Sequence, residues 1–201
     1  MLYLDLFLYD EMIRARHGDL VCGVDEAGRG PLAGPVACAA VILPQGVKIE
    51  ALTDSKKMTE KQRDKVFEEI TEVAVSFSVI LVDNEEIDRI NILQATMQGM
   101  KRAVYDLNIS PDYVLIDGNR VPNTLECAES VIKGDGISAS IAAASVVAKV
   151  TRDRFMLMMD EVYPEYRFAQ HKGYPTKLHY EMIDIYGVTP IHRRSFLKGR
   201  V

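Results

Sequence analysis

Residues 23–31 read GVDEAGRGP, and they join two predicted core strands. It begins at the end of an apolar run from Leu20 to Val24, which is typical of a short buried strand. Two adjacent carboxylates, Asp25 and Glu26, follow at the point where we expect the strand to end. A glycine-rich turn comes next, and the chain is apolar again from Val36 to Leu43. The sequence therefore predicts two core strands joined by a tight turn that carries two acids.

The Asp-Glu pair has two interpretations. The simpler interpretation is a hairpin with two solvated acids at its tip. The other is a metal site, because carboxylates beside a buried strand cost free energy unless they are paired or bound to a metal. Neighbours on a strand point to opposite faces, but a strand end relaxes this rule. Three glycines, Gly28, Gly30 and Gly34, allow a ligand to approach the backbone. A dinucleotide-binding turn is a weaker alternative, because the glycine spacing is one residue too long.

The composition of the chain is that of a globular protein. The chain has 201 residues, of which 48% are hydrophobic and 26% charged, as is ordinary for a globular protein. Three cysteines without metal-type spacing indicate a reducing compartment. The N-terminus lacks a basic leader, and no apolar run is long enough to span a membrane. We therefore expect a cytoplasmic protein.

The net charge of −5 is unevenly distributed. Residues 149–201 contain ten Lys and Arg against six Asp and Glu, whereas residues 1–148 contain fourteen against twenty-three. An acidic part that holds cations and a basic part that holds phosphates would suit a metal-dependent nuclease. Chance is an equally good explanation of this asymmetry taken alone.

Apolar periodicity predicts the remaining elements. We expect helices at 4–16, from a capping box at 59–62 to about 73, at 92–107, at 138–149 with a continuation to about 160, and at 177–186. Further strands are expected at 74–82, 112–116 and 130–133. This mixture indicates an α/β sheet flanked by helices. We expect one domain over 1–201, with 150–201 as its basic helical C-terminal extension.

Two more acids repeat the pattern of a carboxylate at a strand end. Asp117 follows an apolar run and precedes a glycine, and Asp135 lies between two glycines. Each acid alone would usually be a loop or capping residue. If the strand ends meet, these two acids converge with Asp25 and Glu26, and repulsion raises their pKa values. Oxygen ligands favour hard cations such as Mg²⁺ or Mn²⁺ over zinc. Two such ions are the standard device for hydrolysing a phosphodiester.

Residues 23–36, GVDEAGRGPLAGPV, resemble the signature of the ribonuclease HII family, and the resemblance runs through nearly the whole chain. It implies the ribonuclease H-like fold, with a mixed sheet of about five strands and a helical C-terminal part. It also implies an endoribonuclease that uses two Mn²⁺ or Mg²⁺ ions on RNA–DNA hybrids and on ribonucleotides embedded in duplex DNA. Such an enzyme cleaves 5′ of the ribonucleotide and leaves 3′-hydroxyl and 5′-phosphate ends. The catalytic and metal-binding residues implied are Asp25, Glu26, Asp117 and Asp135.

Three further segments match the family's substrate-binding parts. The resemblance implies that the turn at 28–30 contacts the 2′-hydroxyl of the ribonucleotide, and glycines would let backbone polar groups approach the sugar. The DSKK segment at 54–57 has lysines that can hold phosphates. The HKGYPT segment at 171–176 carries the tyrosine that packs on the neighbouring deoxyribose. The substrate-binding residues implied are Gly28, Arg29, Gly30, Lys56, Lys57, Lys172 and Tyr174.

These assignments have simpler alternatives. Arg29 can brace the acidic turn through a salt bridge, the lysines of the DSKK segment can lie in a solvated loop, and Tyr174 can be an ordinary half-buried aromatic. His171 can be structural, a phosphate contact or a proton carrier. The tail after Phe196 departs from the family pattern, which leaves the path of the last residues open.

Two other functions remain possible from the residues alone. One is another two-metal nuclease of the same fold, such as a junction resolvase, although a DNA-only enzyme has no reason to need the glycine-arginine-glycine turn. The other is a non-catalytic nucleic-acid-binding protein, which would not require four acids at strand ends. We expect a monomer, and the sequence contains no segment that resembles a sliding-clamp motif.

Overall fold

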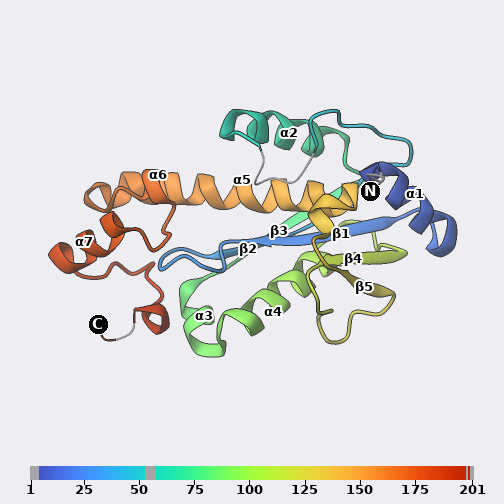
Figure 1. Cartoon of the computed structure of the whole chain (residues 1–201). Helices are drawn as coiled ribbons and strands as arrows, with labels where there is room; N and C mark the ends of the chain where they lie inside the picture. Colours follow the sequence, from blue (N-terminus) through green and yellow to red (C-terminus); the bar gives the residue numbers. More distant parts are fainter. Residues whose placement is uncertain (1–4, 53–57, 198, 200–201) are drawn as a thin grey trace.

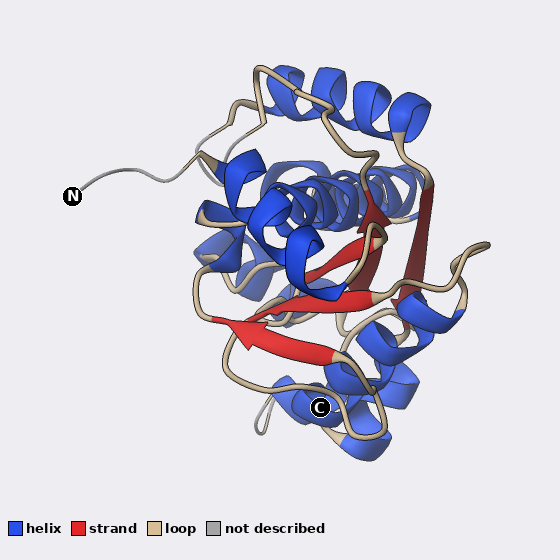
Figure 2. Ribbon diagram, turned by 90° about the vertical axis from the view of Figure 1, so that its right-hand side faces the viewer, coloured by secondary structure: helices blue, strands red, loops and turns tan. Residues whose placement is uncertain are grey.

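The computed structural model describes residues 5–52, 58–197 and 199. One five-stranded mixed sheet forms its centre, in the order β3-β2-β1-β4-β5 (Figure 2). Strand β1 pairs antiparallel with β2 and parallel with β4. The expected mixed sheet of about five strands is confirmed. The strands are β1 Val21–Ala27, β2 Val36–Ile42, β3 Ser76–Val82, β4 Tyr113–Asp117 and β5 Ala128–Val131.

Helices cover both faces of the sheet. Figure 1 shows α5 and α2 on one face and α3 and α4 on the other. Each face has its own apolar cluster, one between β2, α2 and α5 and one between β1, β2 and α4. None of the helices in the described part of the chain is both long and apolar enough to cross a membrane. The α-helices are α1 Leu6–His17, α2 Glu60–Val73, α3 Asn84–Ile90, α4 Ile92–Tyr105, α5 Ala139–Val162, α6 Phe168–His171 and α7 Lys177–Tyr186.

Helix α5 lies directly on β1 because small residues permit a close approach. A Cβ atom on Gly23 would lie 2.0 Å from the backbone carbonyl carbon of Ser140, so only glycine fits there. The buried carboxylate of Asp10 fixes the start of this helix. It accepts hydrogen bonds from the Ser138 hydroxyl at 2.6 Å and from the Ser140 amide at 2.8 Å. Helix α5 is thereby held along β1, the strand that carries the first two acids.

Several expected boundaries are wrong. The first strand does not end before the acids, because Asp25 and Glu26 lie within β1. Strand β5 ends at Val131, since Lys133 takes a left-handed conformation with φ 57° that a strand cannot accommodate. The third strand begins at Ser76 because the preceding residues end α2. Helix α3 was not expected at all. Asp83 caps it by accepting the Glu86 N–H at 2.7 Å.

The C-terminal part packs against the turn between β1 and β2, and Figure 1 shows this turn reaching toward α6 and α7. Leu32 of the turn donates its N–H to the Gly173 carbonyl at 2.8 Å and accepts the Arg193 N–H at 2.8 Å. Leu32 is buried in an apolar cluster with Met156 and Phe168. Helix α5 itself crosses position 150, so the basic extension shares a helix with the rest of the chain.

Candidate active site

Asp25 and Asp117 lie side by side on the neighbouring interior strands β1 and β4. The register of β1 with β4 pairs Val24 with Ile116, and each acid follows its member of this pair. Asp25 is 3% exposed, and its Oδ1 accepts the Glu26 N–H at 2.7 Å. Burial, followed by the charges of Glu26 and Asp117, raises the pKa of Asp25 well above its usual range, against an opposing hydrogen bond from Ser145. Three of the four predicted carboxylates therefore interact strongly.

Asp135 reaches the same region by a different route. It lies in the 3₁₀ turn Gly134–Gly136, not directly after a strand, and its side chain is buried. The N–H of the neighbouring Gly134 donates to Asp117 Oδ1 at 2.6 Å, which ties this turn to the end of β4. The turn that carries Asp135 therefore adjoins the strand that ends in Asp117, and the strand pattern did not predict this turn.

The four acids suit a divalent cation by their chemistry. All are oxygen donors, and burial together with the charges of Glu26 and Asp117 raises the pKa of Asp25, an effect that a bound cation would offset. In the described residues, however, no three Asp, Glu, His or Cys side chains are grouped as they would be around a metal ion. Instead, one carboxylate oxygen of Asp25 and one of Asp117 each accept a hydrogen bond from a backbone N–H. Coordination therefore requires these side chains to adjust when an ion binds.

The glycine-arginine-glycine turn lies next to the acids and to Tyr174. Arg29 Nη1 is 3.6 Å from Glu26 Oε1, so the bracing ion pair expected as an alternative is present. A Cβ atom on Gly30 would lie 3.8 Å from Tyr174 Cε1, which places the aromatic ring beside the turn. Tyr174 is 40% exposed, and the Arg152 guanidinium carbon lies 5.7 Å from its ring centroid. Turn and ring therefore form one partly exposed surface.

The predicted lysines are less informative. Lys172 Nζ donates to the Ala169 carbonyl at 2.6 Å and is half-buried, so its ammonium group already has a structural role. Lys56 and Lys57 lie outside the described residues, together with the rest of the segment 53–57.

Two residues that hold the turn were missed in the sequence. Arg152 of α5 and Arg193 of the C-terminal tail are both fully buried. Between them they donate five hydrogen bonds to backbone carbonyls of residues 28–35 and one to the Lys172 carbonyl in the Tyr174 loop. One signal was available for Arg152, which lies two helical turns after the buried Ser145 and so shares its face of the helix. Arg193 gave no such signal, because it lies in a loop.

Three histidines, His171, His179 and His192, form a cluster next to the Tyr174 loop. His192 Nδ1 accepts the Thr189 N–H at 2.9 Å, so its Nε2 carries the proton and donates to His179 Nε2 at 3.0 Å. His179 Nδ1 then donates to the Tyr174 carbonyl at 3.0 Å. His171 is buried and stacks on His179 with a centroid distance of 4.4 Å. Of the roles left open for His171, this packing favours the structural one.

These histidines should make the stability of the protein depend on pH. Burial lowers the pKa of both His179 and His192 to about 4, with their mutual repulsion as a further cause for His192. Below about pH 6.5 these histidines therefore bind protons in the unfolded chain but not in the folded chain. The free energy of unfolding should fall between about pH 6.5 and 4, by up to roughly 3 kcal/mol per histidine.

Urea unfolding of the wild type and of His192→Gln at several pH values measures this effect. The variant should lose part of the slope below pH 6.5, whereas His17→Gln, at an exposed residue, should keep it. Because buried carboxyls titrate equally in all three proteins, the difference reports the histidines. Equal slopes in His192→Gln and the wild type would contradict the prediction.

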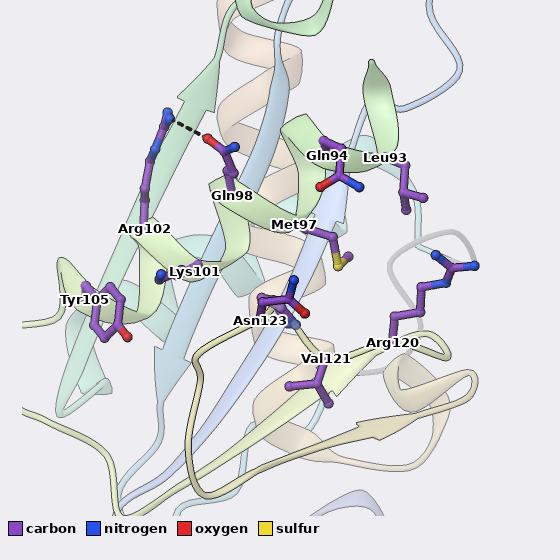
Figure 3. A pocket seen from close by; sticks show the side chains of 11 residues that line it. Leu93, Gln94, Met97, Gln98, Lys101, Arg102, Tyr105, Arg120, Val121 and Asn123 are labelled. Carbon is purple, nitrogen blue, oxygen red and sulfur yellow. Dashed lines mark hydrogen bonds between the residues drawn. The ribbon is translucent and has the colours of Figure 1, made fainter. Parts of the chain in front are cut away.

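A separate groove of about 540 Å³ lies between α4 and the loop that follows β4 (Figure 3). It contains Lys101, Arg102 and Arg120 but none of the four predicted carboxylates. Arg102 is already engaged by Glu86, with its Nη1 and Nη2 donating at 2.9 and 2.6 Å. The groove therefore does not coincide with the acidic site.

Comparison with known proteins identifies relatives over almost the whole chain. The family model described as ribonuclease HII matches residues 22–198. A ribonuclease HII from a Marinomonas species is 56% identical over 184 residues, covering 91% of this chain and 92% of the relative. The crystal structure of ribonuclease H2 from Pyrococcus horikoshii OT3 superposes with a TM-score of 0.74 at 30% identity, covering 90% of this chain and 95% of that one.

Two more distant structures share the fold. An Archaeoglobus fulgidus RNase HII, solved in a complex with PCNA, has a TM-score of 0.68 at 21% identity and covers 87% of this chain and 94% of that one. Bst-RNase HIII, solved in complex with Mn²⁺, has a TM-score of 0.64 at 17% identity and covers 86% of this chain and 65% of that one. At these identities the likeness supports the ribonuclease H-like architecture alone.

Proposed function

This chain belongs to the ribonuclease HII family and is a ribonuclease H, and we propose that it cleaves both RNA–DNA hybrids and ribonucleotides embedded in duplex DNA. Cleavage falls on the 5′ side of the ribonucleotide and leaves 3′-hydroxyl and 5′-phosphate ends. The observation that carries the proposal is the group of interacting acids, Asp25, Glu26 and Asp117, beside a glycine-rich turn and an exposed tyrosine.

Within this proposal the four acids, Asp25, Glu26, Asp117 and Asp135, hold two divalent ions. Bound Mg²⁺ or Mn²⁺ would supply a hydroxide nucleophile and stabilise the leaving oxygen. The residues themselves position the cut. Asp25 is fixed on a central strand under α5, and Asp117 is fixed at the end of the neighbouring strand. Because burial and the neighbouring charges raise the pKa of Asp25, a bound cation would favour loss of its proton.

The turn at Gly28, Arg29 and Gly30 reads the ribose in this scheme. Its small residues let backbone groups reach a 2′-hydroxyl in the wide minor groove of a hybrid duplex. Tyr174, beside Gly30, packs on the adjoining deoxyribose. Lys56, Lys57 and Lys172 are assigned to phosphates. A junction resolvase would not need a surface of this kind. We further propose a single-domain, monomeric enzyme that acts in the cytoplasm.

A cleavage assay on matched duplexes tests the proposal. Three duplexes of one sequence contain zero, one or four ribonucleotides in one strand, and each is incubated with Mg²⁺, Mn²⁺ or EDTA. We expect cuts 5′ of the ribonucleotide with either metal, and an intact all-DNA duplex. Equal cutting of the all-DNA duplex would favour the resolvase, and metal-independent binding without cleavage would favour a non-catalytic protein.

Tyr174→Ala should reduce cleavage at a single ribonucleotide more than cleavage of a long hybrid. The ring is exposed beside Gly30 and supports the sugar at the RNA–DNA junction, a feature that a continuous hybrid does not require at each cut. Removing one stacked ring costs about 1–3 kcal/mol, or about five- to 160-fold in rate. Tyr174→Phe keeps the ring and should keep the activity. Unchanged single-ribonucleotide cleavage in Tyr174→Ala would remove this role from the ring.

A further inference from the structure

We propose that Arg193 and Arg152 are positioning residues that turn the N–H groups of Arg29 and Gly30 outward, as a donor pair for the 2′-oxygen of the substrate ribose. This inference rests on the proposed function, because it explains how the turn would recognise a ribonucleotide. The contact of the turn with the ribose belongs to the proposed function, and the inference adds that two arginines distant in sequence fix the orientation of the peptide groups that make this contact.

Arg193 holds the turn from inside. Its Nη2 donates to the Gly28 carbonyl at 2.7 Å and its Nη1 to the Arg29 carbonyl at 3.0 Å. Its Nε donates to the Gly34 carbonyl at 2.9 Å, at the far side of the same loop. The planar guanidinium presents these donors in a fixed fork, which lysine cannot reproduce. Arg193 therefore fixes the direction of two consecutive carbonyls in the turn.

Arg152 joins the turn to the loop that carries Tyr174. Its Nε and Nη2 donate to the Pro35 and Ala33 carbonyls at 3.0 and 3.1 Å. Its Nη1 donates to the Lys172 carbonyl at 3.0 Å, two residues before the tyrosine. The two arginines thus fix turn and ring relative to each other.

Because two carbonyls of the turn point inward, the N–H groups that follow them point toward solvent. The described residues contain no cis peptide bonds, and in a trans peptide the C=O and the following N–H point in opposite directions. The carbonyls of Gly28 and Arg29 face the buried Arg193, so the N–H groups of Arg29 and Gly30 face outward. Both residues are exposed, and neither N–H donates to a protein group in the part of the chain that the structure describes.

The charge of Arg193 makes these outward groups better donors. A hydrogen bond to a cation is stronger than a neutral one, and it polarises the peptide group that accepts it. Two successive N–H groups that point the same way form a site for an oxygen atom. The 2′-oxygen of ribose and a phosphate oxygen are both acceptors. The position beside Tyr174, the ring assigned to the sugar junction, favours the 2′-oxygen.

Binding measurements on matched variants test this assignment. Arg193→Lys and Arg152→Lys keep the charge and lose the fork, and Arg194→Gln is the control because Arg194 is exposed and adjacent in sequence. Fluorescence anisotropy with Ca²⁺, under conditions without detectable cleavage, gives Kd values for a one-ribonucleotide duplex and for the same all-DNA duplex. Thermal unfolding of each variant is recorded alongside.

We expect the wild type and Arg194→Gln to bind the ribonucleotide duplex more tightly than the all-DNA duplex. In Arg193→Lys this preference should fall about tenfold, the effect of losing roughly one hydrogen bond, with the all-DNA affinity unchanged. Arg152→Lys should lower the preference in the same direction. A preserved preference in folded Arg193→Lys, or an equal loss for both duplexes, would overturn the inference. A wild type without any preference would count against the proposed function instead.

A second measurement needs no variant and covers the case in which Arg193→Lys does not fold. Amide hydrogen exchange of the wild type should show fast exchange at Arg29 and Gly30 in the free enzyme. The ribonucleotide duplex should protect both amides, and the all-DNA duplex should not. Protection in the free enzyme, or equal protection by the two duplexes, would contradict the donor pair.

Discussion

Asp25→Asn should reduce cleavage to the background of the assay with either Mg²⁺ or Mn²⁺, while the protein stays folded. The charges of both Glu26 and Asp117 act on Asp25, and a neutral amide binds a hard cation more weakly than a carboxylate does. Asparagine keeps the shape of the side chain and an oxygen that can accept the Glu26 N–H. The loss should therefore be one of metal binding rather than of structure. Turnover near that of the wild type would exclude Asp25 from the site.

The same variant should be more stable than the wild type in EDTA. Burial and neighbouring charges raise the pKa of Asp25 in the folded protein. Ionisation of this carboxyl therefore lowers the free energy of unfolding as the pH rises above the usual pKa of an aspartate. Asparagine has no such cost. Its melting temperature should exceed that of the wild type at pH 8, and the difference should shrink as the pH falls toward 4. Asp19→Asn, at an exposed loop residue, should show neither effect. Equal stability at pH 8 would contradict the repulsion among these acids.

Gly28→Ala should strongly destabilise the protein, whereas Gly30→Ala should fold normally. A Cβ atom on Gly28 would lie 1.9 Å from Arg152 Nε, and the residue has φ +95°, which side chains rarely adopt. Steric overlap and backbone strain together should lower the free energy of unfolding by about 3 kcal/mol or more. At Gly30 the added atom would have only Tyr174 Cε1 near it, at 3.8 Å, so the change should stay within about 0.5 kcal/mol.

Urea unfolding of the two variants measures this contrast, and cleavage assays extend it. The methyl group of Gly30→Ala lies on the exposed surface between turn and ring, so it should impair every ribonucleotide-containing substrate without affecting the fold. Equal stability of Gly28→Ala and Gly30→Ala would show that the turn is not held as tightly as its buried arginines indicate.

Local signals predicted much of the sheet and the helices. Apolar runs located β1, β2 and β4, and the Thr59–Gln62 capping box located the start of α2, where both of its hydrogen bonds are present. These features depend on neighbouring residues, which the sequence displays directly. Helix α3 was not predicted because its seven residues are mostly polar and too few to form a periodic apolar face.

The site was predictable only in part, for a related reason. Asp25, Glu26 and Asp117 belong to strands whose pairing follows from the sheet, so their meeting could be expected. The supports of the turn depend instead on contacts across more than a hundred residues, such as Arg193 with Gly28. A buried arginine that binds only carbonyls has no acidic partner in the sequence to reveal it. Neither the position of Arg193 nor its function follows from local pattern.

The number of Mn²⁺ ions bound to the enzyme shows whether the four acids hold two divalent ions. Electron paramagnetic resonance can count these ions on the complex with a duplex whose scissile phosphate is replaced by an uncleavable analogue. We predict two ions per chain for the wild type and at most one for Asp117→Asn. Equal numbers of bound ions in the two proteins, or none in the wild type, would contradict this account of the site.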